Sequence, residues 1–387
     1  MNVGIDARTL AGDRSGVGNY LLNIIEAGAF DGYTIYAYYD TSEETPPDID
    51  VPEETDFRWR LIEAPDFVDR ILDLAQPIWW VNGTLHRVLK RDGIDAFFGP
   101  NFVQPALFDG PSAIIVHDVI HRTLPEVHTK TYRLYLRAFL AASVRQADHV
   151  ITVSEHSKRD FLRYHQLPTD RVSVAYGAAD GVYRPRDLSS ETRERICRNF
   201  DIPEQFILYV GNIEPRKNLV AVLDALSQFP DGERPSLVVV GKEQLAYKSL
   251  ERTLKQCSFR DQIHFTGYVP DDDLPLLYNM ASLFIYPSLY EGFGLPVLEA
   301  MQSGTPVITS DRTSLPEVVD DAGLTIDPND CDAIANAIQR LWTNKETREE
   351  YRERGLQQAE NFSWNQTATK ISETIERLAD TTVRTKN

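Results

Sequence analysis

The stretch LFIYPSLYEGFGLPVLEA, residues 283–300, shows how the chain is built. Its first part is apolar and typical of a buried strand, its middle contains two glycines, and a helical pattern begins at Leu295. A strand that passes through a tight turn into a helix is half of a βαβ arrangement. The stretch therefore predicts a parallel sheet covered by helices.

Apolar runs of the same kind recur on both sides of this unit, with amphipathic stretches between them. Because the runs are almost continuously apolar, we expect strands that are buried on both faces, as in parallel sheets. The expected strands are residues 2–7, 33–39, 57–63, 95–99, 112–117, 148–154, 171–176, 206–212, 236–242, 262–268, 283–288, 305–310 and 323–327. The expected helices include residues 18–29, 129–146, 155–165, 189–200, 219–229, 272–281, 295–303 and 331–344.

The length of 387 residues is too great for one ordinary core and suits two domains. The expected strands also outnumber those of a usual sheet. Periodicity breaks at GAADGVYRPR, residues 177–186, which contains glycine and proline. The sequence therefore predicts an α/β protein with two doubly wound Rossmann-like domains, residues 1–185 and 186–363, that face a cleft. Open α/β sheets bind ligands at the carboxyl ends of their strands.

The charge balance argues against a nucleic-acid partner, since the formal net charge is −18. No apolar window approaches the roughly 18 residues of a membrane span, and the N-terminus lacks the features of a signal peptide. The three cysteines form no CxxC pair, which excludes a disulfide framework and a thiolate zinc site. We expect a cytoplasmic protein.

Lysine contributes only 10 of the 40 basic residues. An acidic surface that is poor in lysine stays hydrated in concentrated salt, which is expected of a halophile. The alternative is a generic acidic protein from a GC-rich genome.

Two glutamates, Glu291 and Glu299, flank the glycine turn and the start of the helix. Backbone N–H groups at a helix start suit an anion, and glycines allow a ligand to approach closely. A carboxylate in the first turns, such as that of Glu299, can accept two sugar hydroxyls. The alternative is a carboxylate that only favours the helix dipole. The candidate binding residues in the turn itself are Gly292, Phe293, Gly294 and Leu295.

Two adjacent cations, Arg216 and Lys217, lie in VGNIEPRKN, residues 210–218, between an expected strand and an expected helix. Two cations can neutralise a diphosphate leaving group without a metal. The alternative is a solvated basic turn.

The pair His117 and Asp118 lies at the end of the strand at 112–117, and His121 follows four residues after His117. Two histidines at this spacing can indicate a metal. However, they follow a strand end and no third ligand is evident, so we expect no metal. The alternative is that His117 is a loop histidine whose hydrogen bonds are satisfied within the fold and that has no functional role.

Residues 129–146 form a basic amphipathic pattern without any acidic residue. Such a helix can attach to anionic lipid. The alternative is a helix that packs on the core and exposes a solvated arginine face. The cations are Lys130, Arg133 and Arg137, and the opposite face carries Tyr132, Leu136, Phe139 and Leu140.

The spacing Glu291-x7-Glu299 resembles the signature of retaining glycosyltransferase family 4, whose members have the GT-B fold. AMQSGTPVITSD (300–311) and SLPEVV (314–319) fit the same family. HDVIH (117–121) and EPRKN (214–218) resemble its mannosyltransferase-like branch. The resemblance also implies a C-terminal helix, 364–387, that crosses back to the first domain.

The resemblance assigns roles in the second domain, which would hold the nucleotide sugar. It implies that Glu291 lies at the sugar and phosphate end of the donor and that Glu299 holds the ribose. It also implies that Arg216 and Lys217 bind the diphosphate. Many members carry arginine directly after the glycine, where this chain has Asn212, so Arg216 would supply that charge.

In the first, acceptor-side domain, the resemblance implies that SGVGNY, residues 15–20, is the glycine loop. Gly16 and Gly18 would then lie against the distal phosphate and the sugar. His117 would lie near the reactive sugar, and Asp118 would orient it or face the acceptor. In the second domain, the backbone around Val269 would read the edge of the nucleobase.

The implied function is a metal-independent retaining hexosyltransferase without a cofactor, for which the nucleotide sugar is a substrate. GDP-mannose is the favoured donor, and UDP-glucose-type donors and other GDP-sugars stay open. The acceptor would be a glycan, a polysaccharide or a lipid-linked molecule, with peripheral contact at the cytoplasmic face of a membrane through residues 129–146. The alternatives are a GT-B nucleotide-sugar epimerase or phosphorylase, and a non-catalytic subunit that binds sugar nucleotides.

Overall fold

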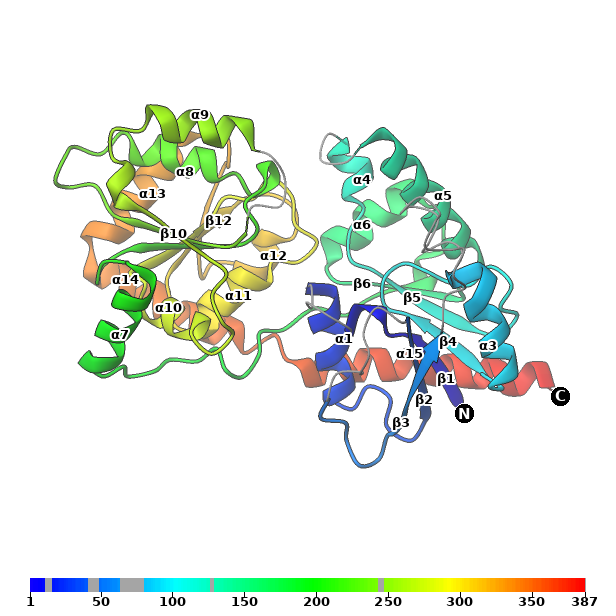
Figure 1. Cartoon of the computed structure of the whole chain (residues 1–387). Helices are drawn as coiled ribbons and strands as arrows, with labels where there is room; N and C mark the ends of the chain where they lie inside the picture. Colours follow the sequence, from blue (N-terminus) through cyan, green and yellow to red (C-terminus); the bar gives the residue numbers. More distant parts are fainter. Residues whose placement is uncertain (11–15, 41–48, 63–79, 126–128, 243–246, 387) are drawn as a thin grey trace. The chain divides into compact units, whose positions relative to one another are not determined.

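The structure is a computed structural model that describes residues 1–10, 16–40, 49–62, 80–125, 129–242 and 247–386 (Figure 1). The chain divides into two compact units. Unit 1 comprises Met1–Gly177 and Ser363–Asn387, and unit 2 comprises Ala178–Phe362. The sequence-based boundary lies between residues 185 and 186, farther along the connecting stretch, because the pattern there changes at the proline of GAADGVYRPR.

Unit 1 contains a seven-stranded sheet. Its strands are β1 (Asn2–Asp6), β2 (Thr34–Asp40), β3 (Asp56–Ile62), β4 (Ala96–Gly99), β5 (Ser112–Val116), β6 (His149–Thr152) and β7 (Val172–Val174). Its helices are η1 (Arg8–Leu10), α1 (Gly16–Glu26), η3 (Trp80–Leu85), α3 (His86–Arg91), α4 (Ile120–Thr123), α5 (Lys130–Gln146), α6 (Glu155–Tyr164), η5 (Thr169–Arg171) and α15 (Trp364–Lys386).

Unit 2 contains a six-stranded sheet. Its strands are β8 (Ile207–Val210), β9 (Leu237–Val240), β10 (Ile263–Gly267), β11 (Leu283–Tyr286), β12 (Val307–Ser310) and β13 (Leu324–Ile326). Its helices are α7 (Ser190–Phe200), η6 (Pro215–Lys217), α8 (Leu219–Leu226), α9 (Lys248–Gln256), η7 (Arg260–Gln262), α10 (Leu274–Met280), α11 (Leu295–Gln302), α12 (Leu315–Val319), α13 (Cys331–Thr343) and α14 (Lys345–Ala359).

The two doubly wound parallel sheets confirm the predicted fold class. Every expected apolar run forms a strand, and the strands pair in parallel within each sheet. The order is β3-β2-β1-β4-β5-β6-β7 in unit 1 and β10-β9-β8-β11-β12-β13 in unit 2. In both sheets the chain reverses its direction of winding between the first and the fourth strand. Ligands of doubly wound folds bind beside this switch point, at the carboxyl ends of the strands. The predicted cleft between the two domains stays a prediction.

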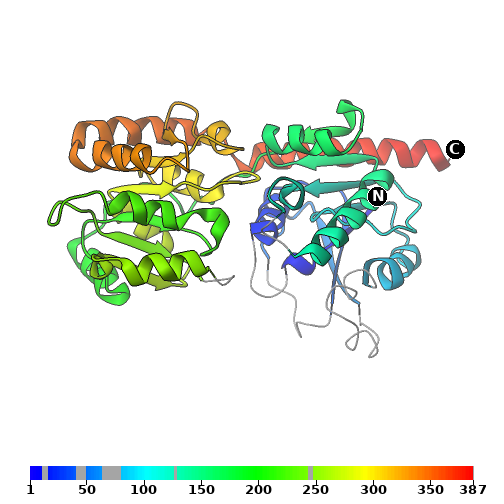
Figure 2. The same cartoon turned by 90° about the horizontal axis from the view of Figure 1, so that it is seen from above.

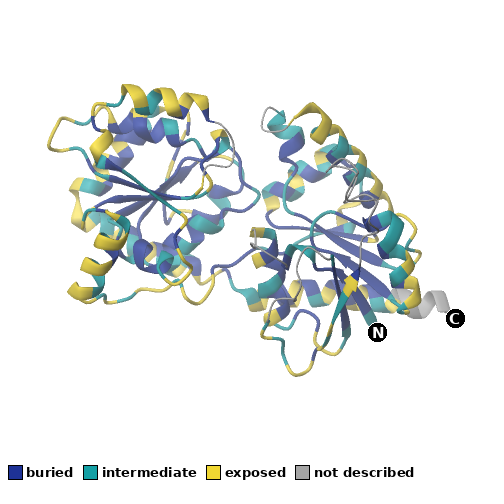
Figure 3. Cartoon of the chain, viewed as in Figure 1, coloured by how far each residue is buried: buried dark blue, intermediate teal, exposed yellow. Residues whose placement is uncertain are grey.

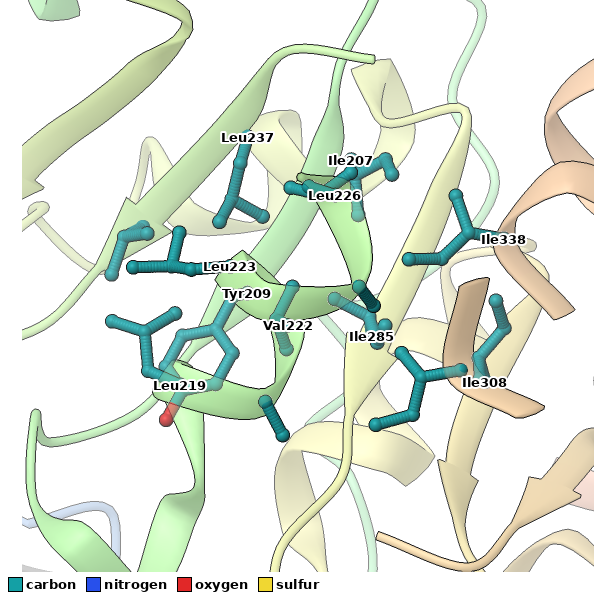
Figure 4. Packing of buried hydrophobic residues seen from close by; sticks show 14 of the residues in the cluster. Ile207, Tyr209, Leu219, Val222, Leu223, Leu226, Leu237, Ile285, Ile308 and Ile338 are labelled. Atoms are coloured by element: carbon teal, nitrogen blue, oxygen red, sulfur yellow. The ribbon is translucent and has the colours of Figure 1, made fainter. Parts of the chain in front are cut away.

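Helices cover both faces of the unit 2 sheet. Figure 1 shows α8, α9 and α13 on one face and α10 and α11 on the other. The strands are dark blue and the outer sides of the helices yellow in Figure 3, as expected of strands buried between two helical layers. One core cluster joins α8 to the sheet, with Leu219, Val222 and Leu226 against Ile207 and Tyr209 (Figure 4).

The C-terminal helix α15 belongs to unit 1. It packs against α1, β4 and β5 and is the red helix in Figures 1 and 2. Trp364, at its start, lies edge-on to Tyr20 of α1, with 5.3 Å between the ring centroids. The Thr367 hydroxyl donates to the Tyr176 carbonyl at 2.6 Å. In the part of the chain that the structure describes, no helix combines the length and hydropathy needed to cross a membrane.

The strand ends of unit 2 require glycine at one position. Gly241 follows β9 with a φ of +145°, and a Cβ there would lie 2.1 Å from the carbonyl oxygen of Gly211. We therefore expect Gly241→Ala to lower the free energy of unfolding of unit 2 by at least about 2 kcal/mol, through overpacking and backbone strain. Gly181→Ala is the matched control, since no heavy atom lies within 4 Å of a Cβ there. Equal melting temperatures of the two variants would contradict this packing.

Candidate active site

The candidate site of unit 2 lies at the switch point of its sheet. Arg216 and Lys217 follow β8 in the short helix η6, and Glu291 follows β11. Because β8 and β11 are neighbours in the sheet, their carboxyl ends bring the two loops together. Lys217 and Glu291 are 74 residues apart in the sequence, and the two loops bring them into contact here.

The carboxylate of Glu291 is the centre of a buried polar cluster. Its Oε1 accepts from Lys217 Nζ at 2.7 Å and lies 2.9 Å from Arg216 Nη1. The hydroxyls of Ser288 and Tyr286 donate to the same oxygen at 2.7 and 3.0 Å. Lys217 Nζ also donates to the Tyr286 hydroxyl. Glu291 and Lys217 are each only 8% exposed, so neither charge is solvated by bulk water.

Arg216 is held from three sides. Its Nη2 donates to Glu214 Oε1 at 2.6 Å, and its Nη1 donates to the Tyr290 carbonyl at 2.7 Å. Its own carbonyl accepts from the backbone N–H of Leu289 at 2.9 Å. The side chains of Glu214 and Glu291 thus balance the charges of Arg216 and Lys217, and the four groups form three interlocked ion pairs.

Burial and charge act in opposite directions on Glu291. Burial alone would raise its pKa, but the charges of Arg216 and Lys217 and the hydrogen bonds from Lys217 and Ser288 lower the pKa to about 2. Burial lowers the pKa of Lys217, and the charge of Glu291 opposes this shift. The cluster is therefore an ion pair at neutral pH.

The loop after β12 fixes the backbone of the glycine turn. The Ser314 hydroxyl reaches the carbonyls of Glu291 and Phe293 at 3.0 and 2.7 Å. Thr313 Oγ1 accepts from the N–H of Glu291 at 3.2 Å, although Thr313 has a φ of +62°. Gly294 has a φ of +118°, and a Cβ at this position would lie 2.6 Å from the side chain of Leu315.

Other candidate residues of the turn are buried or begin the helix. Phe293 is buried and packs edge-on against Phe362, with 5.7 Å between the centroids. Gly292 is half-buried between Glu291 and Phe293, and Leu295 is the first residue of α11.

Glu299 lies in a different environment, in the second turn of α11. Its Oε2 accepts from the Tyr278 hydroxyl at 2.9 Å. Burial raises the pKa of Glu299 to about 7, the Tyr278 hydrogen bond lowers it, and the charges of Asp180 and Asp271 raise it further. The two glutamates therefore have pKa values shifted in opposite directions, and Glu299 titrates near neutral pH.

Val269 lies after β10, beyond Gly267, which has a φ of +70°. Val269 is buried, whereas the preceding Tyr268 is 61% exposed. Lys242, after β9, holds its Nζ 5.0 Å from the centre of the Tyr268 ring. This loop lies on the β10 side of the sheet, at the same carboxyl edge as the cation cluster.

In unit 1 the glycine loop forms the first turn of α1. Gly16 begins the helix and is exposed, with no heavy atom within 4 Å of a Cβ placed there. Gly18, which follows Val17 in the same turn, is buried. Ser15 lies outside the described residues.

His117 follows β5, and its ring is fixed by two contacts. Its Nε2 lies 2.9 Å from the Pro100 carbonyl oxygen, which can only accept, so Nε2 carries the proton. The ring lies edge-on to Tyr20 of α1, with 5.4 Å between the centroids. Burial lowers the pKa of His117, and the Pro100 carbonyl and Asp118 oppose this shift. The ring is neutral, with its lone pair on Nδ1.

Asp118 and His121 lie in different settings. Asp118 Oδ1 accepts from the backbone N–H of Ile120, the first residue of α4. His121 is buried within α4. Among the described residues, no group of three or more His, Cys, Asp or Glu side chains could hold a metal ion.

Several residues that contact the cation cluster or Glu299 were given no role from the sequence. Glu214, Tyr286 and Ser288 reach the cation cluster, and Tyr278 reaches Glu299. Tyr286 ends β11 and Ser288 follows two residues later, and both hydroxyls reach the same oxygen of Glu291. That spacing could have indicated a polar face at the carboxyl end of an otherwise apolar strand.

Two family models match the chain. Glycosyltransferase Family 4 matches residues 14–180, and Glycosyl transferases group 1 matches residues 192–358. The two matched segments fall in unit 1 and unit 2, except for the few residues beyond Gly177.

Curated relatives and solved structures agree with these matches. O-antigen chain mannosyltransferase B of Escherichia coli is 38% identical over 280 residues, which cover 70% of this chain and 72% of the relative. Serotype-specific mannosyltransferase WbdA of Escherichia coli is 33% identical over 248 residues, 63% of this chain but only 30% of WbdA. The crystal structure of Anabaena HepE, in complex with UDP and glucose, superimposes with a TM-score of 0.73 at 19% identity and covers 97% of this chain and 99% of HepE.

The pKa of Glu291 predicts how the stability of unit 2 depends on pH. Because the folded pKa of about 2 is below the ordinary 4.5, the contribution of Glu291 is present above pH 4.5 and is lost as the pH falls toward 2. We expect Glu291→Gln to lower the free energy of unfolding at pH 8 by about 3 kcal/mol. Urea unfolding at pH 8 and at acidic pH measures this. A variant as stable as the parent at pH 8 would contradict the ion pair.

Glu299 predicts the opposite dependence. Because its folded pKa of about 7 is above 4.5, its stabilising contribution is present below pH 4.5 and is lost as the pH rises through 7. We expect Glu299→Gln to change stability little at pH 5 and to raise it by about 1–3 kcal/mol at pH 8. The same urea titrations compare it with Glu291→Gln. A loss of stability at pH 8 in both variants would mean that Glu299 is ionised and paired.

Proposed function

The chain belongs to glycosyltransferase family 4, and from that membership we propose that it transfers mannose from a nucleoside-diphosphate donor with retention of configuration. The observation that carries the proposal is the buried cluster of Glu291, Arg216 and Lys217 at the switch point of unit 2. A glycosyltransferase with such a donor must stabilise a leaving diphosphate. This cluster is a preorganised source of positive charge at the place where α/β sheets bind ligands.

The curated relatives support mannose as the transferred sugar. Both relatives compared above are named mannosyltransferases, and one of them is an O-antigen chain enzyme. We therefore favour GDP-mannose as the donor and a growing glycan, free or lipid-linked, as the acceptor. The protein would take part in the synthesis of a surface polysaccharide.

Lys217 and Arg216 would stabilise the diphosphate as it leaves. Glu291 holds both cations in a fixed place, so little reorganisation is needed when the charge develops. Among the described residues, Lys217 Nζ donates to Glu291 and Tyr286, and an ammonium has three N–H donors. One N–H therefore remains for a phosphate oxygen. This supports transfer that needs neither metal nor cofactor.

The proposed chemical step is a same-face substitution. The bond between the anomeric carbon and the phosphate oxygen breaks and leaves an oxocarbenium-like sugar with the diphosphate beside it. The acceptor hydroxyl forms the new bond on the same face, and the leaving phosphate takes its proton. In this step Glu291 positions the cations and is not the nucleophile, since its Oε1 contacts both cations and accepts from two hydroxyls.

Unit 1 would present His117 to the donor sugar. Since the Pro100 carbonyl fixes the proton on Nε2, the lone pair of Nδ1 is available to accept from a sugar hydroxyl. The exposed start of α1 at Gly16 would take a phosphate or hydroxyl of the donor. Asp118 would face the acceptor.

The surface of α5 supports loose peripheral contact with an anionic membrane at the cytoplasmic face. Lys130 is exposed, Arg133 and Arg137 are half-exposed, and Leu134 is 70% exposed. Leu136 and Leu140 instead pack into unit 1, so the helix would attach through its charges and only slightly through apolar contacts.

The role of the cations predicts the behaviour of Lys217→Ala. We expect its kcat/KM with GDP-mannose to fall about 10²–10³-fold, the scale of removing one preorganised charge-stabilising group. Arg195→Ala, which removes an exposed arginine paired with Asp273, is the matched control and should stay within about twofold of the parent. The parent should keep its activity in a chelator. Normal activity of Lys217→Ala, or rescue of chelated enzyme by manganese, would refute this mechanism.

The role of Glu299 predicts a pH-dependent affinity for the nucleotide. A carboxylate that accepts two ribose hydroxyls binds best when it is ionised, and the pKa of Glu299 is about 7 in the free protein. We therefore expect the affinity for GDP to rise between pH 6 and pH 8 and binding at pH 7 to release protons. Calorimetry in buffers of different ionisation enthalpy measures both. Glu299→Gln should bind more weakly and lose the pH dependence; an unchanged profile in that variant would contradict the ribose role.

A further inference from the structure

Two arginines of unit 1 lie together, and neither has an acidic partner within the described part of the chain. Arg122 is on α4 and Arg137 is on α5, and these helices pack against each other. The guanidinium carbon of Arg122 lies 5.7 Å from the centre of the Tyr164 ring, next to His165 at the end of α6. Residues of three helices therefore meet in one basic cluster, which we call the α4–α5 arginine pair after Arg122 and Arg137.

The polar atoms around this pair lack hydrogen-bond partners. Within the described part of the chain, the Nε of Arg122 and the Nε of Arg137 are both buried and unpartnered. The Thr123 hydroxyl and the Nε2 of His165 are also buried without a partner. His165 as a whole is only 9% exposed. Four polar groups that have lost water without gaining a bond are costly unless a ligand satisfies them.

The electrostatics point to an anion as that ligand. Burial lowers the pKa of Arg122, and the positive charge of Arg137 lowers it further. Burial and the charge of Arg122 lower the pKa of His165. Acidic residues outnumber basic ones by 58 to 40 in this chain, yet neither arginine forms an ion pair among the described residues. Two like charges held side by side in an acidic protein are best explained by an absent negative partner.

We propose that Arg122 and Arg137 form a binding site for a phosphate or diphosphate group on unit 1. Guanidinium groups bind phosphate oxygens through paired N–H donors, and the Thr123 hydroxyl and His165 Nε2 would complete the set. The site is separate from the cation cluster of unit 2. If the proposed transferase function holds, the phosphate would belong to the acceptor, because Arg122 is only four residues after Asp118, which would face the acceptor.

Calorimetry with inorganic diphosphate tests the site. The titration is made in a Lys217→Ala background, which removes the proposed donor site, at constant ionic strength. We expect Arg122→Gln and Arg137→Gln each to weaken diphosphate binding about 10- to 100-fold. Arg145→Gln is the matched control, because Arg145 is an exposed arginine on the same helix α5. It should bind within about twofold of the background protein.

Thermal melting provides a readout that a purely structural role would not give. In phosphate-free buffer, Arg137→Gln removes the repulsion between the two arginines, so its melting temperature should equal or exceed that of the parent. Added diphosphate should raise the melting temperature of the Lys217→Ala protein but not that of its Arg122→Gln or Arg137→Gln derivatives. A structural arginine would instead give a lower melting temperature when it is replaced, with or without diphosphate.

Vesicles identify the source of the phosphate. If a lipid headgroup occupies the site, Arg122→Gln, which leaves the α5 cations intact, will also bind phosphatidylglycerol vesicles more weakly than Arg145→Gln does, with phosphatidylcholine vesicles as the blank. If only diphosphate binding falls, the ligand is the phosphate of a soluble or lipid-linked acceptor. Absence of diphosphate binding in the Lys217→Ala background, or an equal loss in all three arginine variants, would overturn the site. Normal transfer by Lys217→Ala would overturn the proposed function alone.

Discussion

One buried oxygen, Oε1 of Glu291, joins the loops after β8 and β11. It accepts from Lys217 and Ser288 and lies against Arg216, while Glu214 holds Arg216 from the other side. These charges have little contact with solvent, so each would be unfavourable without an opposite charge beside it. The sheet makes the arrangement possible, because neighbouring parallel strands end at the same edge and bring residues far apart in sequence within hydrogen-bond distance.

The surrounding loops act on this oxygen through the backbone. Ser314 bonds the carbonyl of Glu291, and Thr313 accepts its N–H while it adopts a left-handed conformation that is unfavourable for threonine. The rest of the fold must offset the free energy of this unfavourable Thr313 conformation, and in return the glycine turn is held in one geometry. Glu299, eight residues after Glu291, has no cation beside it and titrates near neutral pH, so one short stretch of chain offers an ionised carboxylate and a titrating one.

The strands and the charged residues were predictable from the sequence, because apolar runs and adjacent cations are local signals. Helix α14 was not, since its buried residues are only Tyr351, Gly355 and Ala359, and two of these are small. Gly355 lets α14 approach Met301 of α11, a contact that leaves no apolar periodicity. The contact between His117 and the Pro100 carbonyl was also not predictable, because every residue has a backbone carbonyl and the sequence does not show which one lies near the ring.

The central claim is that Arg216 and Lys217 recognise a diphosphate. Calorimetric comparison of GDP with GMP tests it most directly, because the two ligands differ by the second phosphate. We predict that GDP binds at least about tenfold more tightly than GMP and that this advantage disappears when both cations are replaced by alanine. Equal affinities of the parent protein for GDP and GMP, or an advantage that survives the double substitution, would contradict the claim.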